Sequence, residues 1–483
     1  MEPTLNNRVA NATKWSAIAE IVAKLSGPIV NILLARLLTP TEFGVVASIT
    51  IITSFADIFT DAGFQKYVIQ HEFECEKMLN LYSDVAFTSN VLLSSLIYIL
   101  IFIFRNGLSS LIGCPEAANG LSVASLTVLC TAFSSIAIAR FRRELNFKSL
   151  FYIRLGSSFV PLIVTVPLAF LLRNYWAIVI GTLLQQLYIA IISIAKSSYK
   201  PKIRFELRLC KKMFSFSAWN LCETLSIWFA GQANVFIVGS VLTAYYLGLY
   251  KTGMSTVNSY MSIVTATISP VLFSALSRCQ NDRNQFNEIF LKTQKTIALL
   301  IIPLGVGIFI YRKLVVEILL GSQWSDITDF VGLWAVMSAF TITYSNTACE
   351  VYRSKGLPQI SFILQMAYMI LYIPVIYITA HKGFAILCVA SCLIRGVPVV
   401  LDIVVLHVKF GIRFSSVVKN TYMQFIATAV MALFGFLITK SGAGFALQIV
   451  SVIVCVCIYF GFLFCFPENR KEYKRMIQKI RKR

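Results

Sequence analysis

Long apolar stretches separated by short polar ones follow one another along almost the whole chain. Most stretches approach the roughly 20 residues that an α-helix needs to cross the hydrocarbon of a bilayer. Because backbone groups in hydrocarbon must be hydrogen-bonded within the segment, these stretches predict helices. The pattern predicts an all-α integral membrane protein with about fourteen transmembrane helices. They are expected at approximately 15–38, 43–66, 84–104, 118–139, 149–172, 175–196, 213–240, 245–272, 292–311, 327–350, 357–380, 383–405, 418–438 and 443–466.

The composition agrees with lipid as the main solvent. Hydrophobic residues make up 57% of the chain and charged residues only 13%, whereas about a quarter of the residues of a soluble domain are charged. The polar segments between the apolar stretches are all too short to form a separate catalytic or nucleotide-binding domain. We therefore do not expect an enzyme.

The basic residues are distributed unevenly between alternate loops. With the N-terminus placed inside, the inner segments hold 32 of the 43 Lys and Arg residues and the outer loops hold 6. Cytoplasmic loops of membrane proteins are enriched in Lys and Arg, so both termini are expected in the cytoplasm. The enrichment of basic residues in the inner loops thus explains the net charge of +21, and no nucleic-acid partner is expected. The twelve cysteines lack metal-type spacing, and no metal site or cofactor is expected.

Two short patterns recur in the two halves of the chain. Leu38, Thr39 and Gly44 match Leu242, Thr243 and Gly248 at an offset of 204 residues, and Trp176-Ala177-Ile178 matches Phe384-Ala385-Ile386 at an offset of 208. Both halves start on the same side of the membrane, which indicates a parallel repeat. The expected segments are an N-terminal six-helix bundle (1–198), a cytoplasmic linker (199–212), a second six-helix bundle (213–406), two further helices (407–466) and a basic tail (467–483).

Several of these stretches resemble one family of transporters. They are LLARLLTPTEFGVVA (33–47), FRRELNFKSL (141–150), YYLGLYKTG (245–253), ISPVLFSALSR (268–278) and LVVEILLGSQW (314–324). With them, the chain resembles the polysaccharide repeat-unit flippases of the multidrug/oligosaccharidyl-lipid/polysaccharide exporter superfamily. The resemblance implies two pseudo-symmetric six-helix bundles around a V-shaped central cavity, with two additional C-terminal helices.

The resemblance also implies an activity and a location. A flippase of this family moves polyprenyl-pyrophosphate-linked oligosaccharide from the inner to the outer leaflet of the bacterial cytoplasmic membrane by alternating access. The product serves O-antigen, capsule or exopolysaccharide synthesis, with membrane lipids, a polysaccharide polymerase and a chain-length regulator as further partners. Two alternatives are a cation-coupled multidrug exporter of the same superfamily and a membrane polysaccharide polymerase. The exporter would need an acidic cavity, and the polymerase a larger outer loop.

Charges within the apolar stretches are candidates for function, because they are expensive in a membrane. Lys24 lies in the first predicted helix, with Glu20 one turn before it on the same face. Gly27 and Pro28 follow, and Pro28 removes the hydrogen bond to the carbonyl of residue 24. A cation at a bend suits a gated site for the pyrophosphate. A structural Glu20–Lys24 pair is the alternative.

The remaining candidates lie on three other predicted helices. Lys251 could meet cargo or extend to the outer interface. Asn220, Glu223 and Asn234 make the helix at 213–240 polar, which suits either a sugar-facing wall or contacts between helices. Asp57 and Asp61 are one turn apart. They are candidates for coupling to H+, Na+ or the membrane potential, or for a structural pair with a basic neighbour.

Overall fold

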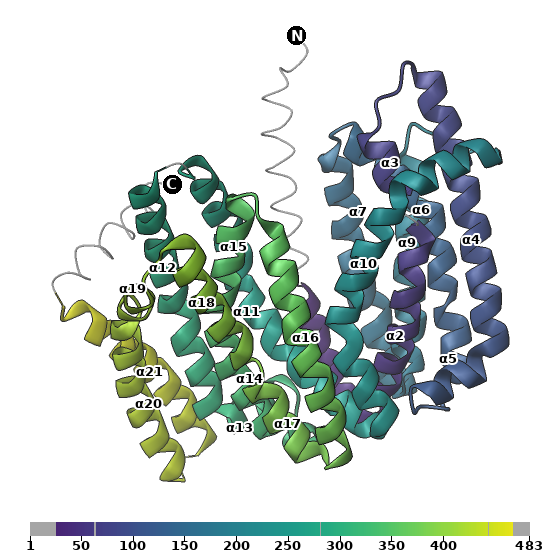
Figure 1. The fold of residues 1–483 in the computed structure, drawn as a ribbon. Helices are drawn as coiled ribbons and strands as arrows, with labels where there is room; N and C mark the ends of the chain where they lie inside the picture. The colour runs from purple at the N-terminus through teal and green to yellow at the C-terminus, as the bar shows by residue number, and fades with distance from the viewer. Residues whose placement is uncertain (1–25, 62–63, 281, 443, 467–483) are drawn as a thin grey trace. The chain divides into compact units, whose positions relative to one another are not determined.

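The computed structural model describes residues 26–61, 64–280, 282–442 and 444–466, and Figure 1 shows their fold. These residues form helices and no strand. After a short apolar helix at Ser26–Leu37, the first part of the chain contains α2 (Pro40–Asp61), α3 (Phe64–Gln70), α4 (Glu76–Leu111), α5 (Ala117–Ala124), α6 (Leu126–Arg143), α7 (Phe147–Val160), the π-helical turn η1 (Pro161–Thr165), α8 (Val166–Leu172), α9 (Trp176–Lys196), α10 (Leu207–Val241) and α11 (Ala244–Arg278).

The second part continues in the same way. It contains α12 (Arg283–Ile310), α13 (Arg312–Leu319), η2 (Ser322–Ile327), α14 (Thr328–Phe340), η3 (Thr341–Asn346), α15 (Thr347–Ser354), α16 (Pro358–His381), α17 (Phe384–Leu393), α18 (Gly396–Phe410), α19 (Phe414–Lys419), α20 (Tyr422–Lys440) and α21 (Phe445–Phe464). Glycines with positive φ allow some of the sharp turns, among them Gly321 (φ 103°) before η2 and Gly383 (φ 110°) before α17.

Twelve helical segments of the described residues are long and apolar enough to cross a membrane. They confirm twelve of the fourteen predicted helices. The predicted helix at 245–272 lies inside the helix α11, which is not one of these twelve. Of the predicted helix at 15–38, the described part is the helix Ser26–Leu37. A multi-pass helical membrane protein is therefore established, and the count of fourteen stays a prediction.

Several observed helices are longer than the predicted spans. Helix α4 has 36 residues, or roughly 54 Å at 1.5 Å per residue, whereas the hydrocarbon is only about 30 Å thick. Its ends therefore extend beyond the hydrocarbon, where polar residues are favourable. Hydropathy recorded only the central part of this helix, at 84–104.

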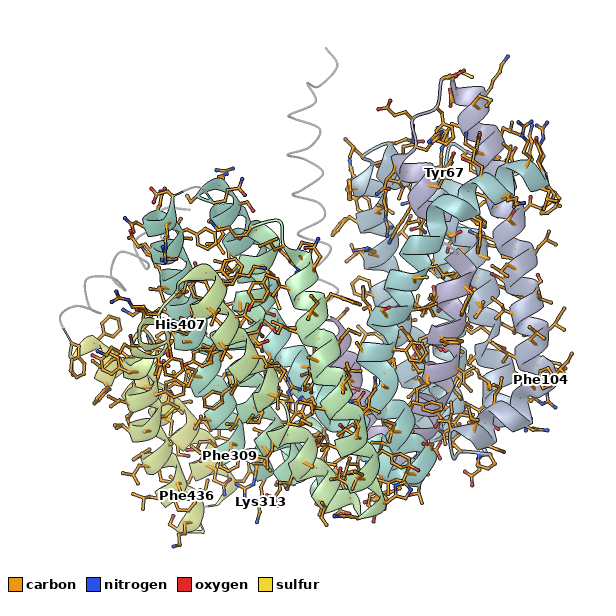
Figure 2. All side chains as sticks on the ribbon, viewed as in Figure 1. Tyr67, Phe104, Phe309, Lys313, His407 and Phe436 are labelled. Carbon is orange, nitrogen blue, oxygen red and sulfur yellow. The ribbon has the colours of Figure 1, made fainter. Side chains whose placement is uncertain are left out.

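The surface of these helices carries large apolar side chains, as lipid-facing helices require. Phe104 on α4 and Phe436 on α20 are 59% and 57% exposed, and Figure 2 shows both side chains at the surface of the protein. In water such a surface would be a liability. In a bilayer it is solvated by acyl chains.

The chain divides into two compact units, and the division falls within α11. Unit 1 ends at Thr252 and unit 2 begins at Gly253. The first two turns of α11 therefore belong to unit 1, together with α10, which packs against α2, α3 and α4. The boundary predicted from sequence, the linker 199–212, lies earlier in the chain and inside unit 1.

The two largest apolar clusters of unit 1 are separate from each other. The α5 cluster joins α2, α4, α5, α6 and α9 through residues such as Ile49, Ile101 and Val128. The α3 cluster joins α3, α4 and α6, with Val85 and Ile136 among its members. Helices α4 and α6 contribute residues to both clusters and pass from one to the other, and α2 packs against both of them.

Unit 2 is built around α12, which packs against α14 and α20, while α20 packs against α21. One apolar cluster includes Phe286, Tyr352 and Leu406. Another joins the last two helices to α12 and α13 through Tyr311, Met431 and Tyr459. The two C-terminal helices are thus an integral part of unit 2.

Two glycines of the internal repeat contact each other's segments reciprocally. A methyl group at Gly44 would lie 1.7 Å from the carbonyl oxygen of Ala244, and one at Gly248 would lie 1.8 Å from the carbonyl oxygen of Pro40. Gly248 and Ala244 are offset by 204 residues from Gly44 and Pro40. The same contact is therefore made twice, with the roles of the two repeats exchanged, as a two-fold relation requires. Only glycine allows the backbones of α2 and α11 to approach this closely.

We predict that Gly44→Ala and Gly248→Ala each lower the free energy of unfolding by about 1–3 kcal/mol, because the added methyl group meets a backbone oxygen that cannot rotate away. Thermal unfolding of the purified protein measures the effect. Gly231→Ala is the control: it lies within α10, a methyl group there meets nothing within 4 Å, and alanine is favoured over glycine in a helix. Equal Tm values for all three variants would contradict the proposed role of the close approach.

Candidate functional site

The structure describes about half of the candidate residues. Lys24 and Glu20 lie outside the described residues, as do the side chains of Asn220, Glu223 and Asp61. Gly27 and Pro28 lie in the helix Ser26–Leu37. Lys251, Asn234 and Asp57 are described with their side chains and lie in unit 1. These three residues are the candidate positions whose surroundings the structure describes.

Lys251 lies on α11, facing α10. Its Nζ is 3.4 Å from Oε1 of Gln232, and the side chain is only partly exposed. Among the described residues, the amide of Gln232 is its one hydrogen-bond partner. A neutral amide oxygen stabilises an ammonium ion less than a carboxylate would. Lys251 therefore keeps donors that could bind an anionic ligand.

Asn234 lies on α10, two residues after Gln232, and is almost fully buried. Its Nδ2 donates to the hydroxyl of Tyr250 at 3.5 Å, and both residues are less than 5% exposed. Asn234 thus holds α10 against the start of α11. In this arrangement it orients the hairpin that carries Lys251 and does not itself offer a surface to cargo.

A group of aromatic side chains joins α10 of this hairpin to α2. The indole Nε1 of Trp228 donates to the hydroxyl of Ser54 at 3.0 Å, and the centroids of the Trp228 and Phe55 rings are 4.9 Å apart. Phe229 contacts both rings and is 53% exposed. These rings pack α10 against α2, and the exposed face of Phe229 could also stack on a sugar.

Asp57 faces a different neighbour. It lies on α2, and its side chain faces Thr131 of α6, whose hydroxyl donates to the carbonyl of Thr127 at 3.0 Å. Its Oδ1 atom is buried and has no hydrogen-bond partner in the described part of the chain. Asp57 and Lys251 therefore belong to separate places in unit 1.

Sequence reasoning missed the attachment of the linker to α4. Asp84 Oδ1 accepts hydrogen bonds from the Tyr199 hydroxyl at 2.5 Å and from the backbone N–H of Lys202 at 3.1 Å. One turn further along α4, the Thr88 hydroxyl accepts from the N–H of Arg204 at 2.9 Å. Burial and the bond to Asp84 raise the pKa of Tyr199, so its hydroxyl remains a donor at neutral pH. These bonds join residues more than 100 positions apart, for which the sequence gives no local signal.

Unit 2 holds two further polar groups within its helices, around Asp402 and Arg395. The carboxylate of Asp402 accepts hydrogen bonds from Ser345 and, at 2.9 Å, from the Tyr352 hydroxyl. The Arg395 guanidinium lies 3.9 Å above the Trp334 ring, and the Trp334 indole donates to Asn258. Bonded in this way, these groups explain how unit 2 tolerates charge within its helices.

The family to which the chain belongs follows from its sequence. Residues 33–329 match the family described as "Polysaccharide biosynthesis protein". The chain belongs to this family. Family members share ancestry and fold, and the match covers more than half of the chain.

Individual relatives extend the similarity over the full length. The chain is 22% identical to the teichuronic acid biosynthesis protein TuaB of Bacillus subtilis, over 98% of this chain and 99% of the relative. It is 26% identical to the succinoglycan biosynthesis transport protein ExoT of Rhizobium meliloti, over 70% and 67% of the two chains. Among solved structures, the lipid II flippase MurJ in an inward closed conformation aligns with a TM-score of 0.71 at 17% identity, covering 96% of this chain and all of the other. The fold is therefore that of the MurJ chain.

We predict that Asp84→Ala frees the linker, because the Tyr199 hydroxyl and the Lys202 N–H would lose a shared acceptor, at a cost of about 1–3 kcal/mol. Limited trypsin digestion of the detergent-solubilised protein should then cleave after Lys202 and Arg204 about tenfold faster or more. Asp84→Asn keeps an acceptor oxygen and serves as the control. An unchanged cleavage rate in Asp84→Ala would show that the linker is held by other contacts.

Proposed function

We propose that the protein is a flippase that moves a polyprenyl-pyrophosphate-linked oligosaccharide from the inner to the outer leaflet of the cytoplasmic membrane, for surface polysaccharide synthesis. The observation that carries the proposal is the combination of two similarities. One relative that aligns over the full length is named for teichuronic acid biosynthesis and another for succinoglycan biosynthesis transport, and the fold is shared with a lipid II flippase. A chain of apolar helices suits a carrier of lipid-linked cargo.

The cargo explains why a protein is needed. A pyrophosphate with attached sugars cannot cross hydrocarbon without losing its hydration, which costs many kcal/mol. The protein must offer polar and cationic groups to the headgroup while the polyprenyl chain stays in lipid. Lys251, with the exposed ring of Phe229 on the adjacent helix, supplies a cation and an aromatic face of the required kind in unit 1.

The first helix completes this proposal. Lys24, with Glu20 beside it, is proposed to contact the pyrophosphate, and Gly27 and Pro28 to let the helix bend during alternating access. Asn220 and Glu223 are proposed to extend the polar wall along α10. The full architecture would have fourteen helices in two six-helix bundles with two additional helices, and both termini in the cytoplasm.

Energy input and partners complete the mechanism. We propose that transport is coupled to H+, Na+ or the membrane potential, in keeping with the fold shared with a multidrug resistance MATE family transporter (TM-score 0.61). A polymerase and a chain-length regulator would use the delivered units on the outer side. The protein itself would form and break no covalent bond.

We predict that deletion of the gene removes surface polysaccharide and causes lipid-linked oligosaccharide to accumulate in the inner leaflet, because the units are made but not translocated. Extraction and mass spectrometry of the lipid-linked intermediates measure this, and complementation with the intact gene is the control. Unchanged surface glycan together with altered drug tolerance would favour a multidrug exporter. Loss of polymer length with normal translocation would favour a polymerase.

A second prediction concerns Lys251. If its charge binds the pyrophosphate, Lys251→Gln and Lys251→Met should lower export about tenfold or more, since a hydrogen bond to a charged group contributes about 1.5–3 kcal/mol, and Lys251→Arg should stay partly active. Lys313→Gln is the control, because Lys313 is an exposed lysine at a helix end (Figure 2). Membrane abundance must be measured for each variant. Normal export by a well-expressed Lys251→Met variant would exclude Lys251 from the cargo site.

A further inference from the structure

A layer of polar side chains crosses unit 1 between the α3 cluster and the α5 cluster. Its members come from three helices: Asp57 from α2, Asn90 and Ser94 from α4, and Thr131 and Ser135 from α6. Asn90 Nδ2 donates to Ser135 Oγ at 2.9 Å. Thr131 faces Asp57, but its hydroxyl donates to the carbonyl of Thr127 at 3.0 Å. Asn90 and Ser94 are completely buried. None of these five residues belongs to the site around Lys251.

The register of the helices places these residues at adjacent levels. Helices α4 and α6 are antiparallel, because residues before Asn90 and after Ser135 meet in the α3 cluster, whereas residues after Ser94 and before Thr131 meet in the α5 cluster. Asn90 is level with Ser135, to which it is bonded. Ser94 is one turn after Asn90 on α4, and Thr131 is one turn before Ser135 on α6, so Ser94 and Thr131 lie at the same level. Asp57 faces Thr131 and therefore lies at this level too.

Three buried oxygen atoms in this layer have no hydrogen-bond partner among the described residues. They are Asp57 Oδ1, Asn90 Oδ1 and Ser94 Oγ. Buried polar atoms are satisfied in the great majority of cases. Other buried atoms of the described chain, such as Ser193 Oγ, also lack a partner. What distinguishes these three oxygens is that the register of the helices places them within two helical turns of one another.

The orientation of Asn90 is determined by its neighbour. The hydroxyl of Ser135 donates to the carbonyl of Ala132 at 3.2 Å, so its hydrogen is already used. It can only accept from Asn90, which must therefore present its NH2 group to Ser135. The carbonyl oxygen Oδ1 of Asn90 is left as the unsatisfied atom.

Ser94 differs from the other hydroxyl residues of α4. Ser83, Thr88, Ser89 and Ser95 each donate to the carbonyl four residues earlier, at 2.7–2.9 Å. This is the usual way in which a helix satisfies a buried hydroxyl. Ser94 makes no such bond. Its oxygen is consequently available to a ligand in the layer.

We propose that this layer binds a Na+ ion through Asp57 Oδ1, Asn90 Oδ1 and Ser94 Oγ, with the Thr131 hydroxyl as a further oxygen. Oxygen atoms are the ligands that hard cations take in proteins. The single carboxylate balances one positive charge. An ionised carboxylate in a membrane interior is expensive unless it is paired or coordinates a metal, and Na+ removes this cost.

The position of the layer connects it to the transport pathway. Ser54, which accepts the indole N–H of Trp228 on α10, lies one turn before Asp57 on α2. Occupancy by Na+ would favour one rotational setting of α2 and thereby affect the α2–α10 contact. This coupling role, unlike the binding of the ion, rests on the proposed flippase function.

The test is thermal unfolding of the purified full chain in detergent, in NaCl and in choline chloride of equal concentration. At a Na+ concentration near 100 times Kd, the Tm of the intact protein should rise by about 5 °C or more. In Asp57→Asn the rise should disappear. Ser94→Ala should raise the Tm in choline chloride, because an unsatisfied hydroxyl is removed, and should weaken Na+ binding about tenfold.

Two matched controls separate binding from general stability. Ser193 on α9 is also a buried serine whose hydroxyl has no partner in the described chain, and Ser193→Ala should leave the response to Na+ unchanged. Asp84→Asn removes another buried carboxylate of unit 1 and should also leave it unchanged. If Asp57→Asn fails to fold, Ser94→Ala and its control still decide the question.

Equal Tm values for the intact protein in the two salts would overturn the proposal, as would a Tm that responds to pH and not to Na+, which would indicate a protonated Asp57. Equal Na+ responses in Ser94→Ala and Ser193→Ala would also overturn the assigned ligands. The measurement needs no cargo, so its outcome is independent of the deletion experiment. Normal Na+ binding without a polysaccharide phenotype would refute only the flippase function.

Discussion

Hydrocarbon offers no hydrogen-bonding partner, and the structure of this protein depends on that constraint. Every backbone N–H and C=O in the membrane must be satisfied within its own segment, which leaves the helix as the form for isolated apolar spans. The constraint then extends to side chains. Hydroxyl groups along α4 donate to the carbonyl one turn earlier, and Asp84 and Asp402 each collect more than one donor. Among the polar groups of the described chain that escape this rule, three lie in one layer of unit 1, at Asp57, Asn90 and Ser94.

Small residues allow helices to associate in a membrane, where the hydrophobic effect does not drive association. Lipid tails are as apolar as leucine, so helices in a membrane gain little from burying apolar surface alone, and close packing becomes important. Gly44 and Gly248 bring α2 and the start of α11 into backbone contact. Since each glycine contacts the repeat-related segment of the other, one short motif, duplicated in the chain, supplies both sides of the contact. Together with Asp84, which holds the linker, this contact keeps α10 and the first turns of α11 within unit 1.

The two candidate sites of unit 1 illustrate different uses of buried polarity. Lys251 has only the amide of Gln232 as a partner in the described chain, and it lies on a hairpin that Asn234 and Tyr250 fasten together. Asp57 lies in the interior between two apolar clusters, where a partner must be enclosed by the bundle. A lipid headgroup that enters and leaves needs a site like that of Lys251, where the charged group keeps free donors. A small ion that stays bound needs an enclosed site like that of Asp57.

The amino-acid sequence by itself determined the class of the protein. Hydropathy depends on each segment separately, so twelve of the predicted helices agree with the structure, and the repeat at Gly44 and Gly248 was visible as a spacing. The predicted helix at 245–272 lies within α11. Hydropathy shortened α4, because the helix ends that extend beyond the hydrocarbon carry a weaker apolar signal. Charges within apolar stretches identified Lys251 and Asp57 as candidates without showing their neighbours. Only the tertiary structure decided that Asp57 meets Thr131, that Ser94 lacks its usual acceptor and that Asp84 holds the linker. Such contacts depend on how each helix is rotated against its neighbours, and packing between distant segments sets that rotation.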